Sequence, residues 1–250
     1  MLRLLDTFAG IGGFSFAAER LVGGISTEQF VEINPYSQSI LRKHWPEVPI
    51  HDDIRSFRAP AGSFDIISGG FPCQDISQAG HRAGLSGERS GLWWELLRVI
   101  RMVGPSYVVL ENVAAITHRG LGDVLGSLAA AGYDCEWACI RASDLGACHQ
   151  RDRWWAVAYR CGQHLQRRRT KRQPLIDPPS QAAGALWRDE RARPLSPDWK
   201  AYTSQPLLLR GDDGLANRVD RLKALGNSVV PQVAAIPLAR VIDLEHLRIE

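Results

Sequence analysis

The chain has 250 residues, of which 45% are hydrophobic and 23% are charged, and this balance is ordinary for a soluble globular protein with one substantial core. No apolar run approaches the length needed to cross a bilayer, and the first six residues are too few and too soon charged for a signal peptide. We therefore expect no membrane partner.

The net charge of +3 is unevenly spread. Residues 160–194 hold nine Lys or Arg and three Asp or Glu, which is +6, so the remainder of the chain carries −3. A basic segment on a nearly neutral body predicts a polyanion as partner, and a solvated charged loop is the alternative. The five cysteines form no Cys-x-x-Cys pair, so we expect neither a disulfide framework nor a metal site.

The first predicted strand covers residues 2–8 and runs into Ala9-Gly10-Ile11-Gly12-Gly13, after which a helix is predicted over 14–21. A strand, a glycine-rich turn and a helix form the frame for a nucleotide-like cofactor. The third glycine of the dinucleotide fingerprint is missing, which favours a cofactor other than NAD. A tight structural turn is the alternative explanation of these glycines.

A second strand over 29–32 ends in Glu32, about 20 residues after the glycines, where such folds bind a ribose hydroxyl. The alternative is a surface or helix-capping carboxylate ahead of the helix predicted over 35–44. A short third strand over 48–50 precedes two more candidates. Asp53 is placed to bond an adenine amino group, and Ile54 to pack on the ring.

The fourth strand, over 64–68, leads into Gly69-Gly70-Phe71-Pro72-Cys73. We interpret the glycine pair as a turn, because glycine adopts backbone angles closed to other residues. Cys73 then stands at the carboxyl end of a strand under a polar loop, where open α/β sheets usually carry out chemistry. A candidate nucleophile results, and a buried inert thiol is the alternative.

A helix over 92–103 is followed by a nearly continuous apolar strand over 106–113, as expected for a parallel strand buried on both faces. Glu111 stands at its end. A buried carboxylate is costly unless it has a partner or a task, so Glu111 is a candidate catalytic acid rather than a loop acid.

A helix over 121–131 and strands over 133–142 and 153–160 complete the alternation of a doubly wound sheet. If the segment before the last strand is extended, Arg151 and Arg153 point to one side and face a single ligand. From Cys161 to about Gln205 the periodicity disappears, which indicates a binding insert or a disordered linker. The last helix is predicted from Pro231 to about Leu247.

Together these motifs resemble the DNA cytosine-5 methyltransferase family over residues 2–160 and about 214–243, in the family's order. Residues 6–13 resemble its S-adenosylmethionine loop, and residues 70–74 its nucleophile motif. Residues 111–113 match the catalytic acid motif, and residues 226–229 the C-terminal motif that returns to the cofactor pocket. The arrangement is most similar to compact phage or prophage members.

The resemblance implies an α/β fold, a Rossmann-like doubly wound sheet of the S-adenosylmethionine-dependent methyltransferase type with a small irregular target-recognition insert. Residues 1–160 would form the catalytic and cofactor-binding domain, and residues 161–205 the short basic insert. Residues 206–250 would form a C-terminal segment that returns to the catalytic domain. We expect a monomer in the cytoplasm of a bacterial cell, with a role in DNA methylation of the restriction-modification kind.

The implied reaction transfers a methyl group from S-adenosyl-L-methionine to carbon 5 of cytosine in double-stranded DNA. The cytosine is flipped out, and the Cys73 thiolate adds to carbon 6. Glu111 would supply a proton to the base, Arg153 would bond its carbonyl oxygen, and Arg151 would help to hold Glu111 and the base. An RNA cytosine-5 methyltransferase and a catalytically silent DNA-binding relative are the alternatives. The presence of all four residues argues against the silent relative.

The resemblance also implies two sets of binding residues. The cofactor set comprises the glycine turn, the acids after the next two strands, and apolar neighbours: Phe8, Gly10, Gly12, Glu32, Ile33, Asp53, Ile54, Leu92, Asn227 and Val229. The DNA set comprises the loop after the nucleophile and the basic run: Gln74, Ser77, Arg89, Arg167, Arg168 and Arg169. The basic run would make phosphate contacts, so binding should weaken steeply with salt.

Overall fold

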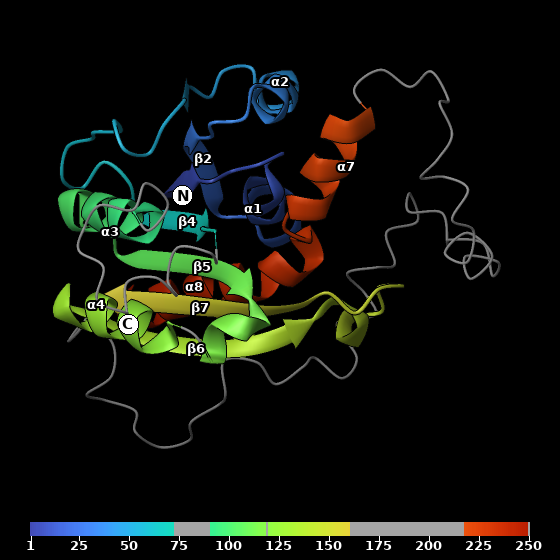
Figure 1. Ribbon diagram of the computed structural model, residues 1–250. Coiled ribbons are helices and arrows are strands. Elements are labelled where there is room, and N and C mark those ends of the chain that lie inside the picture. Colours follow the sequence, from blue (N-terminus) through green and yellow to red (C-terminus); the bar gives the residue numbers. More distant parts are fainter. Residues whose placement is uncertain (73–90, 119, 161–217, 250) are drawn as a thin grey trace.

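The computed structural model describes residues 1–72, 91–118, 120–160 and 218–249 (Figure 1). Within them, seven strands form one sheet in the order β3-β2-β1-β4-β5-β7-β6. The strands are β1 (Leu2–Thr7), β2 (Ile25–Val31), β3 (Ile50–His51), β4 (Ile66–Gly70), β5 (Tyr107–Val113), β6 (Tyr133–Arg141) and β7 (Asp152–Arg160). The helices are α1 (Gly13–Phe16), which continues as a π-helical segment (Ala17–Val22), α2 (Pro35–His44), α3 (Leu92–Val103), α4 (Leu121–Ala130), α7 (Arg218–Asn227) and α8 (Pro231–Ile249).

The helices predicted over 35–44 and 92–103 are confirmed as α2 and α3, and each predicted strand is present with small shifts of its ends. β2 begins at Ile25 rather than at residue 29, and β3 at Ile50 rather than at residue 48. α7 was not predicted. The doubly wound α/β class is confirmed.

The sheet is mixed. β1 to β5 run parallel, whereas β7 pairs antiparallel with β5 and with β6. The strand order reverses between β1 and β4, since β2 and β3 lie on one side of β1 and β5 lies beyond β4. In such sheets the crevice at the carboxyl ends of the strands, at the point of reversal, binds ligands. This position brings the glycine turn after β1 and the end of β4 to one site.

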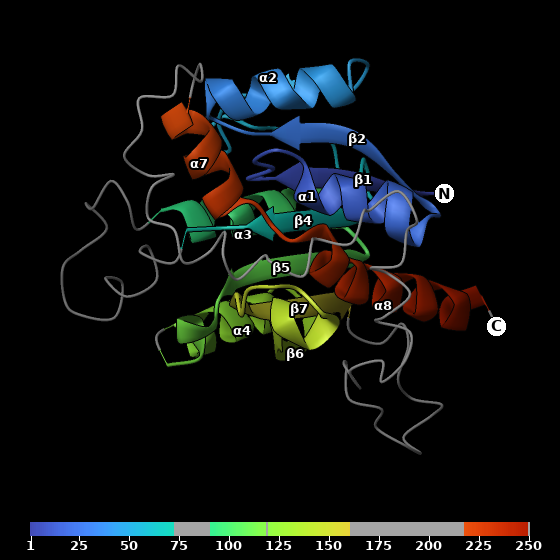
Figure 2. The same cartoon turned by 90° about the vertical axis from the view of Figure 1, so that its right-hand side faces the viewer.

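Alternate residues of the central strands belong to two apolar clusters, one on each face of the sheet, because successive side chains of a strand point to opposite faces. Leu5 and Ile67 belong to the apolar cluster that contains α3 and α4 residues. Leu4 and Ile66 belong to the cluster that contains α1 and α8 residues. Figures 1 and 2 show α3 and α4 on one face of the sheet and α1 and α8 on the other.

The segment Ala224–Arg248 is long and apolar enough, by length and composition, to cross a bilayer, which the sequence analysis did not expect. Its apolar side chains have another use here. Ala234, Leu238 and Val241 have no exposed surface and belong to the cluster beneath the sheet. In this structure, therefore, α8 buries one apolar face against the sheet.

The predicted turn at Gly69 and Gly70 is wrong, because β4 runs through Gly70 and neither glycine has a positive φ. Close approach explains the glycines instead. A Cβ on Gly69 would lie 2.8 Å from Thr7 Oγ1, and a Cβ on Gly70 would lie 3.2 Å from Glu111 Oε2. The glycine pair thus lets the ends of three neighbouring strands crowd together.

Candidate active site

The turn after β1 is held by a carboxylate from the next strand. Phe8, Gly10 and Gly12 have positive φ values of 52°, 56° and 86°. The Gly10 amide donates to Glu32 Oε2 at 2.7 Å, and the Asn34 amide donates to Glu32 Oε1 at 2.7 Å. Asn34, not Glu32, caps α2. Glu32 is therefore a fixed, buried carboxylate beside the glycine turn.

The glycine turn borders open space on one side and packs tightly on the other. A Cβ on Gly10 would meet nothing within 4 Å, so the backbone there borders open space. A Cβ on Gly12 would lie 2.6 Å from the Trp45 ring, so that glycine is needed for packing. Ile33 directly follows Glu32 in the sequence and is 64% exposed. An exposed apolar side chain therefore lies next in sequence to the carboxylate that binds the Gly10 amide.

Four other candidates of the cofactor set divide into three apolar residues of one cluster and one charged acid. Phe8, Ile54 and Leu92 belong to the same apolar cluster, in which Ile54 is buried and the other two are partly buried. Asp53 is paired with Arg55, whose guanidinium nitrogen lies 2.7 Å from the carboxylate. The hydrogen bond from the Arg55 side chain lowers the pKa of Asp53 below its usual value. Asp53 is thus a charged acid beside the apolar cluster.

The C-terminal segment returns to the glycine turn. A Cβ on Gly13 would lie 2.8 Å from the Val229 carbonyl oxygen, and a Cβ on Gly70 would lie 3.9 Å from Val229 Cγ2. Asn227 is exposed at the end of α7. Val229 therefore lies between the start of α1, which its backbone approaches, and the end of β4, which its side chain approaches.

Glu111 lies where β4 and β5 end. Its register partner in β4 is Gly70, which precedes Cys73 by three residues in the sequence. Only 9% of Glu111 is exposed. Its Oε1 atom lies 2.8 Å from Arg153 Nε. Burial raises the pKa of the Glu111 carboxyl, and the charges of Arg153 and Arg151 oppose that shift. The result is a buried acid with one ion-pair partner, beside the strand that leads to the cysteine.

Asn112 fixes the segment that leads to the cysteine. Its Nδ2 atom donates to the Phe71 carbonyl at 2.9 Å, and its Oδ1 atom accepts from the Val113 amide at 2.8 Å. Only 2% of Asn112 is exposed. The sequence analysis gave this residue no role, although its place directly after a buried acid is a usable signal.

The two arginines have different partners. Arg151 has a φ of 33°, so the extended backbone assumed for it is wrong. Its guanidinium donates to the Gly226 carbonyl at 3.0 Å and to the Ser228 carbonyl at 2.6 Å. Burial lowers the pKa of Arg151, the nearby Arg153 adds to this, and Glu111 opposes it. Arg153 thus holds the acid, and Arg151 holds the C-terminal motif.

Several predicted site residues lie outside the described residues. They are the candidate nucleophile and the whole predicted DNA set: Cys73, Gln74, Ser77, Arg89, Arg167, Arg168 and Arg169. In the described ranges, no group of three or more His, Cys, Asp or Glu side chains is placed to hold a metal ion.

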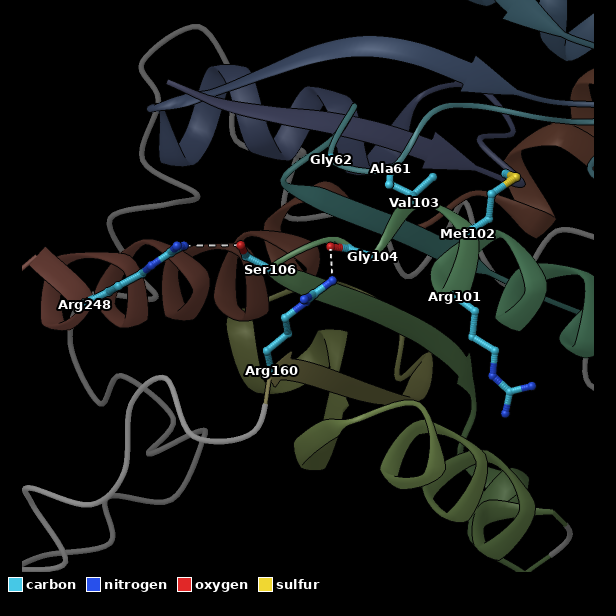
Figure 3. Close-up of a pocket in the computed structure, with 9 residues that line it drawn as sticks. All are labelled: Ala61, Gly62, Arg101, Met102, Val103, Gly104, Ser106, Arg160 and Arg248. Atoms are coloured by element: carbon cyan, nitrogen blue, oxygen red, sulfur yellow. Dashed lines mark hydrogen bonds between the residues drawn. The ribbon is translucent and has the colours of Figure 1, made fainter.

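A cavity of about 350 Å³ lies at the opposite end of the sheet (Figure 3). It is lined by Ala61, Gly62, Arg101, Met102, Val103, Gly104, Ser106, Arg160 and Arg248. Arg160 donates to the Gly104 carbonyl at 2.6 Å and closes the end of α3, and Arg248 donates to Ser106 Oγ at 3.2 Å. Ser106 directly precedes β5, whereas Glu111 stands near its far end, so this cavity is separate from the candidate site.

Asp6 is a second buried carboxylate near the site. It has no exposed surface, and its oxygens accept from Ser15 Oγ and Ser68 Oγ, each at 2.7 Å. Burial raises the pKa of Asp6 to about 7, and the two serine hydroxyls oppose the shift. Folding therefore takes up a proton at Asp6 at mildly acidic pH.

This uptake sets the sign of a pH effect. Between about pH 4 and pH 7 the unfolded chain has lost the Asp6 proton and the folded protein still binds it, so stability falls as pH rises through this window. We expect Asp6→Asn to remove a slope of up to about 1.4 kcal/mol per pH unit. Urea unfolding of parent and variant from pH 4.5 to pH 8 measures this. Parallel pH profiles of the two proteins would contradict it.

The sheet order, the glycine turn after the first strand and the buried acid near the end of β5 define a Rossmann-like methyltransferase fold. Residues 2–204 match the family model described as C-5 cytosine-specific DNA methylase, and the chain belongs to that family. The expectation from the sequence motifs is thereby confirmed.

Curated relatives include two type II methyltransferases. M.CviJI of Paramecium bursaria Chlorella virus IL3A is 37% identical over 162 residues, which are 63% of this chain and 43% of that protein. M2.BsuMI of Bacillus subtilis is 32% identical over 160 residues, which are 61% of this chain and 40% of that protein. The chain thus spans less than half the length of these relatives.

Solved structures agree on the fold. The Dnmt2 methyltransferase of S. pombe superposes with a TM-score of 0.56 at 23% identity, over 64% of this chain and 51% of that one. A DNMT2 mutant of Spodoptera frugiperda gives a TM-score of 0.56 at 19% identity, over 68% and 54% of the two chains. At these identities the likeness concerns the fold alone.

Proposed function

We propose that the protein transfers a methyl group from S-adenosyl-L-methionine to carbon 5 of a cytosine in double-stranded DNA. The observation that carries the proposal is the position of Glu111. Glu111 is a buried acid on β5 that pairs with an arginine. Its register partner is Gly70 on β4, the strand that leads to Cys73. Family membership supports the reaction class, and the geometry around Glu111 supports the roles proposed for the residues.

Cys73 is proposed as the nucleophile that adds to carbon 6 of the base. Such addition makes carbon 5 reactive and divides one difficult step into easier ones. The thiolate form is needed, and an ordinary thiol with a pKa of about 8.5 is only a few per cent ionised at neutral pH. Asn112 supports the reaction by fixing the Phe71 carbonyl two residues earlier, so that the segment leaving β4 has a defined direction.

Glu111 is proposed as the acid that shares a proton with ring nitrogen 3 as sulfur adds to the base. Its burial favours the protonated form, which can donate. Arg153 approaches the same carboxyl at 2.8 Å, and we propose that it also bonds the carbonyl oxygen of the base. Arg151 would act from the other side by holding the backbone at Gly226 and Ser228 in place.

The cofactor would lie along the glycine turn, with the Glu32 carboxylate at its ribose and Ile33 and the Phe8 cluster at its ring. When bound there, it supplies the methyl group. The cytosine has to leave the duplex to reach this site, at a cost of a few kcal/mol.

Covalent trapping tests the proposal. The protein is incubated with S-adenosylmethionine and duplex DNA that contains 5-fluorocytosine, which cannot lose its substituent after methyl transfer. We expect a stable protein–DNA adduct whose linked peptide contains Cys73. Folded protein that binds the cofactor but forms no adduct would overturn the enzymatic proposal and favour a silent DNA-binding protein. Methyl label found in transfer RNA, and not in duplex DNA, would redirect the proposal to RNA.

The basic run after β7 gives a prediction about affinity. We expect Arg167→Gln, Arg168→Gln and Arg169→Gln together to weaken binding to all duplex sequences and to reduce the slope of log affinity against log salt by about 2 to 3. Fluorescence anisotropy with a labelled duplex between 50 and 200 mM salt, a range of about fourfold, measures the slope. The matched control is Arg55→Gln, which removes a charge near the predicted cofactor edge. An unchanged slope in the triple variant would make the run a solvated loop.

A further inference from the structure

Asp6 joins two parts of the candidate site that lie far apart in the sequence. It is near the end of β1, between β2 and β4 in the middle of the sheet. One carboxylate oxygen accepts from Ser15 Oγ in α1, and the other accepts from Ser68 Oγ in β4, both at 2.7 Å. All three side chains have no exposed surface.

Each serine belongs to a different part of the proposed chemistry. Ser15 is in α1, the helix that begins directly after the glycine turn. Ser68 is the register partner of Asp6, two residues before Gly70 and five before Cys73. Thr7 Oγ1 adds a bond to the Ser68 carbonyl at 2.6 Å. Through one carboxylate, the cofactor turn and the nucleophile strand share a single anchor.

Burying the Asp6 carboxylate costs more free energy than a purely structural contact between these segments would need. A buried carboxylate needs compensation for its lost hydration, and within the described part of the chain no ion pair reaches Asp6. Two serine hydroxyls provide the compensation instead. An apolar residue, with apolar neighbours, would fill the same space at lower cost.

We propose that Asp6 is a positioning residue that couples cofactor binding at the glycine turn to the attack of Cys73, through Ser15 on one side and Ser68 on the other. The proposal rests on the proposed function. It assigns Asp6 no contact with substrate or cofactor. It predicts that loosening one side of the carboxylate disturbs the function of the other side.

Ser15→Ala and Ser68→Ala test this coupling by their crossed effects. We expect Ser68→Ala, although it lies on the nucleophile side, to weaken S-adenosylmethionine binding about threefold to tenfold. We expect Ser15→Ala, with cofactor saturating, to slow adduct formation with 5-fluorocytosine DNA by a similar factor, about threefold to tenfold. The double variant should lose less than the product of the two single losses, because both act through one carboxylate.

The controls separate coupling from general loosening. Ser127→Ala removes a hydroxyl that donates to the Val124 carbonyl and accepts from Trp93 Nε1, and we expect it to change neither readout. All titrations are made well below the melting temperature of each variant. If an alanine variant does not fold, Asp6→Asn replaces it, since its one amide oxygen can accept from only one of the serines; both readouts should then fall.

Calorimetric titration with S-adenosylmethionine and the rate of adduct formation give distinct outcomes. Cofactor affinity that Ser68→Ala leaves unchanged, or losses in the double variant that simply multiply, would overturn the coupling. A parent protein that binds cofactor but forms no adduct overturns the proposed function, while the cofactor titrations still decide the role of Asp6. A parent that binds no cofactor overturns both.

Discussion

We expect Cys73→Ser to abolish methyl transfer, with a fall in its rate of at least about 10⁴-fold, because a serine hydroxyl is a far weaker nucleophile than a thiolate. The fluorocytosine adduct disappears as well. Cofactor affinity stays within about twofold of the parent value, since Cys73 is proposed to attack the base and not to bind the cofactor. Single-turnover methyl transfer and calorimetry measure the two quantities separately.

The control for this variant is Cys139→Ser, which changes an exposed thiol in β6. It should retain the parent rate and the adduct. A Cys73→Ser protein that still methylates DNA would remove the covalent mechanism. A large loss of cofactor affinity in that variant would instead make Cys73 part of the cofactor site.

Glu111→Gln keeps the size of the side chain but removes the proton that the acid would share with the base. We expect the rate of methyl transfer to fall by about 10²- to 10⁴-fold. The partly buried Arg153 loses its carboxylate partner, so some stability is lost as well. Rates are therefore measured at a temperature where circular dichroism shows the variant fully folded.

A second carboxylate–arginine pair provides the matched control. Glu136 pairs with Arg240 at 3.1 Å, and both side chains are about a quarter exposed. Glu136→Gln breaks this ion pair between β6 and α8, away from the strand ends that form the site. Its rate should stay within about twofold of the parent rate. If the two variants lose activity equally, Glu111 acts through stability and not as an acid.

Local sequence patterns were sufficient for most of the elements. The helix over 35–44 follows from Pro35 at its start and the helix over 92–103 from Pro105 after its end, and both are local signals. The strand over 107–113 follows from a continuous apolar run. The antiparallel direction of β7 was not accessible in this way, because strand direction depends on which strand it pairs with.

The candidate site shows the same division. The motifs around Gly10, Glu32 and Glu111 are each contiguous in the sequence, and these three residues lie at the carboxyl ends of parallel strands. Their partners are distant in sequence and could not be read from it. Asn112 reaches the Phe71 carbonyl across 41 positions, and Arg151 reaches Gly226 across 75. The purpose of Gly69 and Gly70 was misread for this reason, since the crowding comes from neighbouring strands.

The sequence by itself determined the family and most of the elements in their order, and it indicated the cysteine, the acid and the two arginines as candidate site residues, because each is carried by a short contiguous motif. Only the tertiary structure decided which of these groups contact one another. The shared carboxylate of Asp6, the pairing of Arg153 with Glu111 and the return of Val229 to Gly13 all join segments from different parts of the chain. Such contacts depend on strand order and register, and these are fixed by the packing of the whole sheet.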